Sequence, residues 1–222
     1  EGKLMTDYKT ARTAMVDCQV RPSDVTKYPI IDALLSTPRE AYVPDAIRPV
    51  AYAGEHISLG NGRVLLDPRT FAKMLDALNV QPNELVLDLG CGLGYSSAIL
   101  AKMAEAVVSV ESDPDMAKVA SETLSEQSVD NAYVALGDLA SGNAKNGPYD
   151  AIILQGSVQT IPDTLIEQLK DGGRICALFQ NNNHGECRIG YKSHGNVSWR
   201  TVFNATAPLI NGFETIKEFK FA

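Results

Sequence analysis

Three glycines at alternate positions form the segment of this sequence with the clearest chemical meaning. Gly90, Gly92 and Gly94 follow an apolar stretch at 85–89 that is typical of a buried strand, and a helix is expected to begin near Tyr95. Glycine lets the chain turn sharply and lets a ligand approach the backbone without an intervening side chain. In doubly wound sheets, a nucleotide-like ligand binds at this first strand-to-helix turn. The segment therefore predicts such a site.

The spacing of the glycines indicates which ligand the turn accepts. Dinucleotide sites use the pattern GxGxxG, in which the helix N-terminus receives a pyrophosphate. Here the pattern is GxGxG, and Asp88 stands two residues before the first glycine. A carboxylate at that place suits a ligand with an ammonium group better than it suits a pyrophosphate. Dinucleotide binding remains the alternative interpretation.

Two further acids follow the next predicted strands. Glu111 ends the apolar stretch 107–111, and Asp138 follows the stretch 132–136. A carboxylate after the second strand can accept hydrogen bonds from ribose hydroxyls. Taken singly, a glutamate at a strand end is usually solvated, and an aspartate such as Asp138 can simply cap a loop. Together with Asp88, the three acids are predicted to converge on one crevice, because parallel strands end at the same edge of a sheet.

This combination resembles the cofactor site of class I S-adenosylmethionine-dependent methyltransferases. The resemblance implies that Asp138 holds the adenine amino group and that S-adenosylhomocysteine is the product. The cofactor-binding residues that it implies are Asp88, Gly90, Cys91, Gly92, Gly94, Glu111, Ser112, Asp138, Leu139 and Gln155.

A wider resemblance covers nearly the whole chain from Met5 onward. Segments in the same order resemble the protein-L-isoaspartate O-methyltransferase family: Pro38–Pro44, Ala51-Tyr52, Gly60–Gly62, Asp67-Pro68, Gly137-Asp138, Pro148–Ile153, Ile161-Pro162, Leu169–Arg174 and Pro208-Leu209. The cofactor half is common to class I methyltransferases, whereas the N-terminal half is more specific to the family. The resemblance implies methyl transfer to the carboxylate of isoaspartyl residues, the first step in the repair of damaged proteins.

One motif departs from the family pattern. The family reads G-Q-T-I-S-Q-P where this chain reads Gly62-Arg-Val-Leu-Leu-Asp-Pro68, so Leu66 stands at the position of the family's active-site serine. An acceptor carboxylate without that hydroxyl loses about 1–3 kcal/mol, or about ten- to a hundredfold in binding or rate. Asp67 also adds a negative charge unless it caps the next helix. Arg63 is a candidate acceptor contact, because guanidinium groups bind carboxylates, although a solvated loop arginine is the simpler interpretation.

Catalysis by such an enzyme requires few reactive side chains. A carboxylate acceptor is already ionised at neutral pH, so the expected contributions are alignment of the acceptor and exclusion of water. No metal site is expected, because the chain has Gln155 where metal-dependent catechol methyltransferases place an acid. The loop after the fourth strand and the absence of a Pro-Cys pair also argue against enzymes that methylate nucleic acids. The histidines, His56, His184 and His194, are expected at the surface, although His56 falls in the region that should cover the acceptor pocket.

Three functions remain open from the sequence. The first is an isoaspartyl or related carboxyl methyltransferase. The second is a methyltransferase of the same ancestry with a different, small-molecule acceptor, which Leu66 favours. The third is a non-catalytic S-adenosylmethionine-binding protein, which an acceptor pocket filled by side chains would favour.

The elements that must position these residues can be predicted from hydrophobic periodicity and helix caps. Expected strands are 85–89, 106–110, 132–136, 149–154 and 174–179, and expected helices are 5–20, 28–35, 95–104, 114–127 and 162–170. Asp67-Pro68 and Asp113-Pro114 each predict a capped helix start, and Gly172-Gly173 is expected to end the last helix. The first 66 residues lack strong strand signals, and 187–221 are expected to form two further strands.

This alternation predicts an α/β, Rossmann-like class I methyltransferase fold. The expected sheet is twisted and mostly parallel, with an antiparallel C-terminal hairpin at its edge. Residues 1–4 are interpreted as a cloning remnant, 5–66 as an N-terminal helical and loop segment that covers the active site, and 67–222 as the cofactor-binding domain.

Composition limits the class of protein. Of 222 residues, 45% are apolar and 21% charged, which is enough to bury a sizeable core. The net charge of −7 and the scattered basic residues argue against a nucleic-acid partner. No apolar run is long enough to span a membrane, and the four cysteines form no CxxC pair. A reduced, cytoplasmic protein is therefore expected. The resemblance implies a protein or peptide substrate or a small-molecule acceptor, and the oligomeric state is not predicted.

Overall fold

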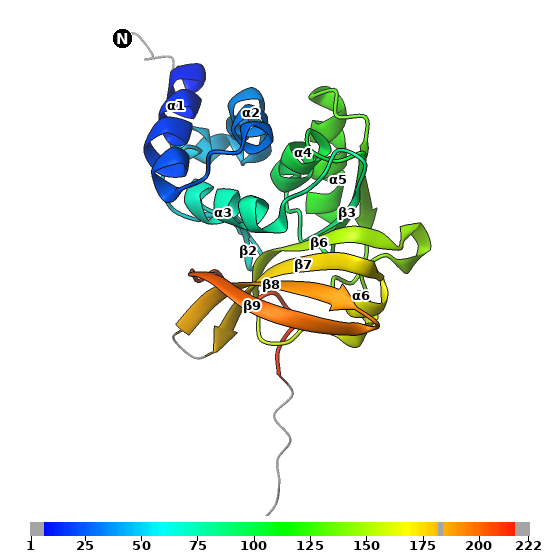
Figure 1. The fold of residues 1–222 in the computed structure, drawn as a ribbon. Helices are drawn as coiled ribbons and strands as arrows, with labels where there is room; N and C mark the ends of the chain where they lie inside the picture. Colours follow the sequence, from blue (N-terminus) through cyan, green and yellow to red (C-terminus); the bar gives the residue numbers. More distant parts are fainter. Residues whose placement is uncertain (1–6, 182–183, 216–222) are drawn as a thin grey trace, which may run out of the picture.

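A seven-stranded sheet organises the structure, a computed structural model that describes residues 7–181 and 184–215 (Figure 1). The strand order is β5-β4-β3-β6-β7-β8-β9. Neighbouring strands from β5 to β7 are parallel, and β8 and β9 are added antiparallel. The strands are β3 (Leu85–Leu89), β4 (Ala106–Glu111), β5 (Ala132–Leu136), β6 (Tyr149–Val158), β7 (Leu169–Asn181), β8 (His184–Ser193) and β9 (Asn196–Asn204). This sheet confirms the predicted fold class.

The connections reverse direction at the centre of the sheet. From β3 the chain moves outward to β4 and β5 and then returns to place β6 on the other side of β3. Ligands of open α/β sheets bind at such a switch point, beyond the carboxyl ends of the strands. The glycine turn that follows β3 lies at this point.

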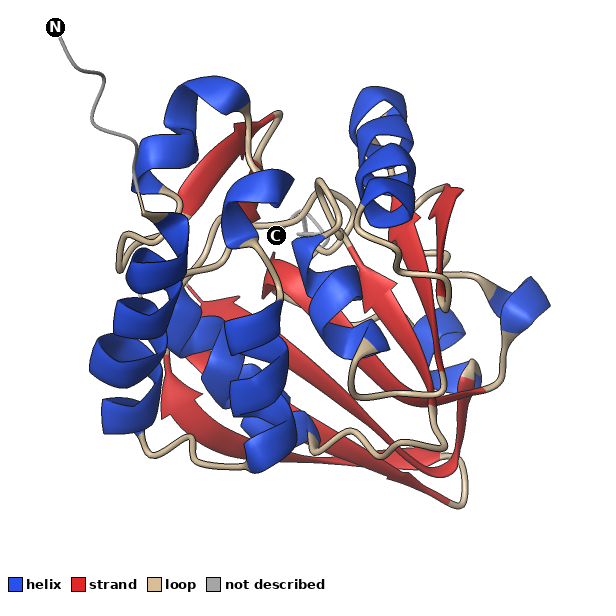
Figure 2. Ribbon diagram, turned by 90° about the horizontal axis from the view of Figure 1, so that it is seen from above, coloured by secondary structure: helices blue, strands red, loops and turns tan. Residues whose placement is uncertain are grey.

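Helices α1 to α5 pack on one face of the sheet, which Figure 2 shows from above, and the short α6 packs on the other. Their bounds are α1 (Tyr8–Met15), α2 (Tyr28–Ser36), α3 (Pro68–Leu78), α4 (Tyr95–Ala101), α5 (Pro114–Glu126) and α6 (Asp163–Glu167). The predicted caps are present: Asp67 accepts a hydrogen bond from the Thr70 amide, and Asp113 accepts from the amides of Asp115 and Met116. These bonds satisfy amide groups that the first helical turn leaves free.

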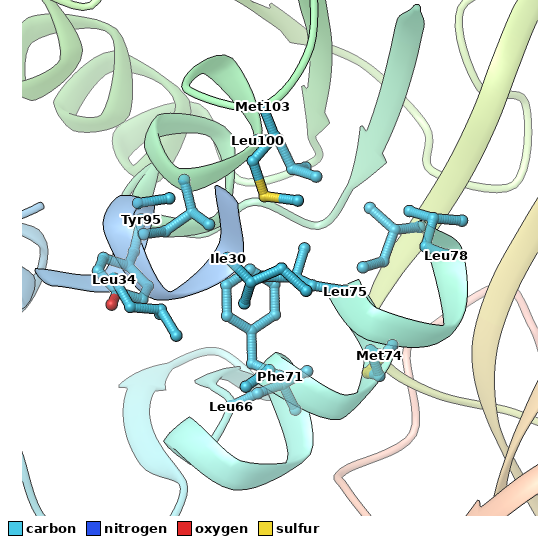
Figure 3. Packing of buried hydrophobic residues seen from close by; sticks show 14 of the residues in the cluster. Ile30, Leu34, Leu66, Phe71, Met74, Leu75, Leu78, Tyr95, Leu100 and Met103 are labelled. Atoms are coloured by element: carbon cyan, nitrogen blue, oxygen red, sulfur yellow. The ribbon is translucent and has the colours of Figure 1, made fainter. Parts of the chain in front are cut away.

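The apolar core divides along the strands, because successive side chains point to opposite faces. One face carries Val86 and Ile153, and it packs against the N-terminal helices, α3 and α4. The other face carries Leu87 and Ile152 and is covered by α6 and the chain near Phe213. Figure 3 shows the first core, in which residues of α2, α3 and α4 interleave with residues just before α3 and just after α4: Ile30, Leu34, Leu66, Phe71, Met74, Leu75, Leu78, Tyr95, Leu100 and Met103. Residues before and after position 67 share this core, and the predicted division there stays a prediction.

The sequence analysis missed one hairpin. β1 (Ile57–Gly60) and β2 (Arg63–Leu65) pair antiparallel around a turn in which Gly60, Asn61 and Gly62 all have positive φ. Asn-Gly is a strong hairpin signal, but the flanking strands have only four and three residues. Runs this short do not produce a visible period of two.

Several predicted boundaries were wrong. α6 ends at Glu167 and α4 at Ala101, so helices 162–170 and 95–104 were predicted too long. Gly172-Gly173 does not end a helix; it lies within β7, where the register with β6 jumps between the pairs Tyr149–Leu169 and Ala151–Arg174. β6 and β7 also continue beyond 154 and 179.

The chain termini differ from their predictions in detail. The predicted helix 5–20 is α1 followed by a π-helical turn, Val16–Val20. Residues 1–4, interpreted as a cloning remnant, lie outside the described residues. The two C-terminal strands confirm the edge hairpin but occupy 184–204; residues 205–215 add only an isolated bridge, and the rest of the predicted range is not described.

Arg174 on β7 joins the sheet to the end of α3. Its guanidinium donates to the carbonyls of Leu78 (2.5 Å) and Asn79 (2.7 Å) and forms two hydrogen bonds with the Glu84 carboxylate (2.6 and 2.7 Å). Both charged side chains are largely buried. The cation thus satisfies carbonyl groups that the helix end leaves free.

We predict that Arg174→Met lowers the free energy of unfolding by about 3 kcal/mol, because Glu84 then remains buried without its cation. Urea denaturation measures the change. Lys118→Met is the control: it breaks an exposed pair with Glu122 on α5 and is expected to cost less than about 1 kcal/mol. Equal effects of the two substitutions would contradict the role given to Arg174.

Candidate active site

The glycine turn has the backbone geometry that only glycine adopts without strain. Gly90, Gly92 and Gly94 have φ of 80°, 56° and 97°. A Cβ on Gly92 would lie 2.7 Å from Cδ1 of Leu59, far closer than van der Waals contact. Gly94 is the N-cap of α4. As predicted, no glycine side chain separates the backbone of the turn from the group that packs on it.

Glu111, at the end of β4, is a fully buried carboxylate with many donors. Its Oε2 accepts from the Gly92 amide (2.8 Å). Its Oε1 accepts from Nε of Arg63 (3.0 Å) and from the amides of Ser112 (2.8 Å) and Asp113 (3.2 Å). Because a buried charge must be paired and hydrogen-bonded, these contacts fix the carboxylate directly beside the glycine turn.

Asp88, on β3, is also fully buried, and it joins three elements. It accepts from the hydroxyls of Ser96 (2.6 Å) and Ser97 (2.9 Å) at the start of α4 and from the amide of Gln155 (2.8 Å) on β6. Burial and, to a smaller extent, the nearby Glu111 charge raise the pKa of Asp88 to about 6 against the opposing effect of these hydrogen bonds. Gln155 itself lines a small cavity at the turn.

The remaining predicted cofactor residues lie around the turn at different depths. Asp138 is exposed and caps its own loop by accepting from the amide (2.9 Å) and hydroxyl (2.6 Å) of Ser141. Leu139 is buried in the second core, 3.6 Å from the Cβ position of Gly90. Cys91 is buried, and burial raises the pKa of its thiol well above the usual value. Ser112 is exposed at the rim.

The unpredicted hairpin lies across the glycine turn. Leu59 of β1 covers Gly92, and the guanidinium of Arg63 on β2 reaches both Glu111 and the hydroxyl of Ser112 (3.0 Å). The structure therefore places Arg63 against the end of β4, and it is buried rather than solvated, so the simpler interpretation of a solvated loop arginine was wrong. A contact between Arg63 and an acceptor stays a prediction.

Leu66 and its neighbours form an apolar wall beside the turn. The Leu66 side chain is 2% exposed. With Tyr42, Phe71, Tyr95 and others it lines a cavity of about 10 Å³, which has room for about one water molecule. The segment is held from two sides, by Arg39 and by His56.

Arg39 was not identified from the sequence as a site residue, although it stands in a family segment. Its guanidinium is fully buried, donates to the carbonyls of Ala51 (2.7 Å) and Leu66 (2.8 Å), and lies 4.9 Å from the ring centroid of Tyr95. Desolvation lowers the pKa of Arg39. A lone arginine in a turn gives no sequence signal for this role.

His56 is half-buried and bridges two loops, whereas His184 and His194 are exposed as predicted. Its Nδ1 accepts from the Asp67 amide (2.9 Å), and its Nε2 lies 2.7 Å from the carbonyl of Thr206. The carbonyl can only accept, so Nε2 carries the proton. Asp67 caps α3 as predicted, and its carboxylate is 14% exposed.

Within the described ranges, two features that would point to other functions are absent: a metal-binding cluster and a membrane-spanning helix. There, no group of three or more histidine, cysteine, aspartate or glutamate side chains is arranged to hold a metal ion. Among the helices of the same residues, none has the length and apolar character needed to cross a membrane.

A family model and the most similar curated sequences identify one family. The profile described as Protein-L-isoaspartate(D-aspartate) O-methyltransferase (PCMT) matches residues 11–206. A protein-L-isoaspartate O-methyltransferase of Methanoculleus marisnigri is 36% identical over 75% of this chain and 76% of its own length. One of Methylorubrum extorquens is 31% identical over 94% of this chain and 92% of its own length.

Solved structures show the same fold. One called protein-L-isoaspartate O-methyltransferase aligns with a TM-score of 0.80 at 20% identity, over 90% of this chain and 66% of that chain. A putative Plasmodium falciparum protein-L-isoaspartate O-methyltransferase, solved in complex with S-adenosyl-L-homocysteine, aligns with a TM-score of 0.76 at 17% identity, over 92% of this chain and 98% of that chain.

The raised pKa of Asp88 predicts a pH-dependent stability. Between the usual value of 3.8 and about 6, the folded protein holds a proton that the unfolded chain releases, so stability falls as the pH rises through this window. The side-chain amide of an Asp88→Asn variant cannot titrate. The free energy of unfolding of wild type relative to this variant is therefore expected to fall by about 2 kcal/mol between pH 4 and pH 7. Urea denaturation at several pH values measures it, and a constant difference would contradict the buried environment assigned to Asp88.

Proposed function

The chain belongs to the protein-L-isoaspartate O-methyltransferase family, and from this premise we propose that it transfers a methyl group from S-adenosylmethionine to the carboxylate of an isoaspartyl residue. The observation that supports this most is the glycine turn at the switch point, with Asp88, Glu111 and Asp138 at the ends of three strands. A protein or peptide is therefore the proposed substrate. A cytoplasmic location stays a prediction.

The residues at the turn fit this cofactor. Glu111 is the proposed acceptor of hydrogen bonds from the ribose hydroxyls, the role that acids after the second strand have in related folds. Asp138, exposed at the end of β5, is the proposed partner of the adenine amino group. Asp88 is saturated by Ser96, Ser97 and Gln155, so we propose that it acts on the cofactor's ammonium end mainly by orienting Gln155 and the start of α4. When bound, S-adenosylmethionine supplies an activated methyl group on a positively charged sulfur.

Alignment and exclusion of water are the proposed contributions of the protein to the reaction. A carboxylate acceptor needs no general base, because it is ionised at neutral pH. Leu66, Tyr42 and Phe71 provide an apolar wall that keeps water out, and Arg39 and His56 fix the backbone of the segment that carries Leu66. A fixed segment matters because the acceptor oxygen must stay in line with the methyl carbon.

A second candidate is supported by Leu66. A buried leucine stands where the family signature has a serine, and the leucine side chain itself offers no hydrogen-bond donor to an acceptor carboxylate. A less charged, small acceptor would lose nothing by this change. Because the cavity beside Leu66 is small, a non-catalytic S-adenosylmethionine-binding protein is also one of the outcomes that the assay distinguishes.

We predict that the unmodified protein methylates an isoaspartyl peptide and leaves the matched aspartyl peptide unmethylated. Transfer of label from S-adenosylmethionine measures this. Leu66→Ser restores a donor and is expected to raise kcat/KM about tenfold, whereas Leu66→Val, the control for lost side-chain volume, is not. Tight cofactor binding without transfer to either peptide would contradict the isoaspartyl acceptor and favour the alternatives.

We further predict that Asp138→Ala weakens binding of S-adenosylhomocysteine about tenfold, through loss of a charge-assisted hydrogen bond to adenine. Calorimetry measures the affinity. Asp130→Ala is the matched control, because Asp130 is an exposed acid just before the opposite end of β5. If Asp138 only caps its loop, both variants will bind as wild type does.

A further inference from the structure

The β1–β2 hairpin, residues 57–65, is fixed in place by a buried ion pair. Nε of Arg63 lies 3.0 Å from Oε1 of Glu111, with the two side chains 8% and 0% exposed. The guanidinium also donates through Nη2 to the hydroxyl of Ser112 (3.0 Å). At the tip of the hairpin, Nδ2 of Asn61 donates to Oδ2 of Asp113 (2.6 Å). Arg63 and Asn61 thus attach the hairpin to the end of β4 and to the start of α5.

The hairpin also fills the space above the glycine turn. Leu59 lies at an irregularity in the pairing of β1 with β2, and its Cδ1 occupies the space that a Cβ on Gly92 would need. The cavity there measures about 10 Å³, whereas sites for small molecules typically measure about 300–1,000 Å³. A nucleoside cannot lie on the turn while Leu59 and Arg63 keep these positions.

Arg63 takes the hydrogen-bonding capacity of Glu111 that a ribose needs. The amides of Gly92, Ser112 and Asp113 already donate to the carboxylate, and Arg63 adds a side-chain donor to Oε1. A ribose binds an acid at this place through its hydroxyl groups. Arg63 and a ribose that binds both oxygens of the carboxylate therefore compete for Oε1 and for the same space.

We propose that Arg63 competes with the cofactor for Glu111 and thereby sets the cofactor affinity, because the cofactor binds only after the tip of the hairpin has left the turn. This inference rests on the proposed function, in which Glu111 holds the ribose. The base of the hairpin is anchored by the bonds of Arg39 to Leu66 and of His56 to Asp67, so the movement is confined to the tip and its flanking residues.

The energetics give the direction of the effect. An apparent affinity is reduced by the fraction of molecules in the competent state. Removing Arg63 leaves the Glu111 carboxylate buried without a cation when the hairpin is closed, which disfavours that arrangement. Loss of the arginine should therefore populate the open hairpin and tighten cofactor binding, which is the opposite of what loss of a direct ligand contact would do.

The test is calorimetric binding of S-adenosylhomocysteine to the full chain, with Arg63→Gln compared with wild type. We expect binding at least about tenfold tighter. Asn61→Ala, which removes the second attachment, should tighten binding less strongly. Arg48→Gln is the control, because it removes the same charge from an exposed pair with Asp45 and should bind as wild type does. Hydrogen exchange without ligand is the second readout: amides of 57–65 should exchange faster in Arg63→Gln, while those of β3 should not.

The outcomes separate the inference from the proposed function. Weaker or unchanged binding by Arg63→Gln, with wild-type binding intact, overturns the competition and leaves the proposed function in place. Binding by Arg63→Gln when wild type binds too weakly to measure supports both. If neither protein binds S-adenosylhomocysteine although both are folded, as equal melting temperatures would show, the proposed function fails and the inference fails with it.

Discussion

Two buried carboxylates at the centre of the sheet determine how the rest of this structure is arranged. Asp88 and Glu111 are fully buried at the ends of adjacent strands, where an uncompensated charge would cost several kcal/mol. Each therefore gathers donors from several elements. Asp88 joins β3, α4 and β6 through Ser96, Ser97 and Gln155. Glu111 gathers the glycine turn, the start of α5 and the hairpin. Two of the acids that we propose for the cofactor site therefore also hold together the elements around the turn.

The sequence predicted the features that depend on local chemistry. The strand before Gly90, the caps at Asp67 and Asp113 and the alternation of strands and helices follow from periodicity and backbone geometry, and the structure confirms them. The features it missed depend on contacts between distant segments. Arg63 meets Glu111 across 48 residues, and Arg39 meets the carbonyl of Leu66 across 27. Neither pairing can be predicted from the sequence immediately around the residues involved.

Register explains the remaining errors. The sequence predicts a helix over 162–170 that Gly172-Gly173 ends, because a glycine pair is a common helix stop. In the structure, tertiary pairing with Tyr149 draws Leu169 into β7, and the glycines accommodate the shift in register. The acceptor region is the least predictable part of the site, because Leu66 replaces a polar residue without changing the helix start that follows it. Membership of the family thus fixes the expected chemistry more firmly than it fixes the expected acceptor.

The most direct test of this account is a crystal structure of the full chain in complex with S-adenosylhomocysteine. The account predicts that the ribose hydroxyls bind the carboxylate of Glu111 beside the glycine turn, with Arg63 and Leu59 displaced from their present positions. It also predicts that Asp88 keeps its bonds to Gln155 and to the serines of α4. A ligand bound away from the turn, or bound there while Arg63 still pairs with Glu111, would contradict it.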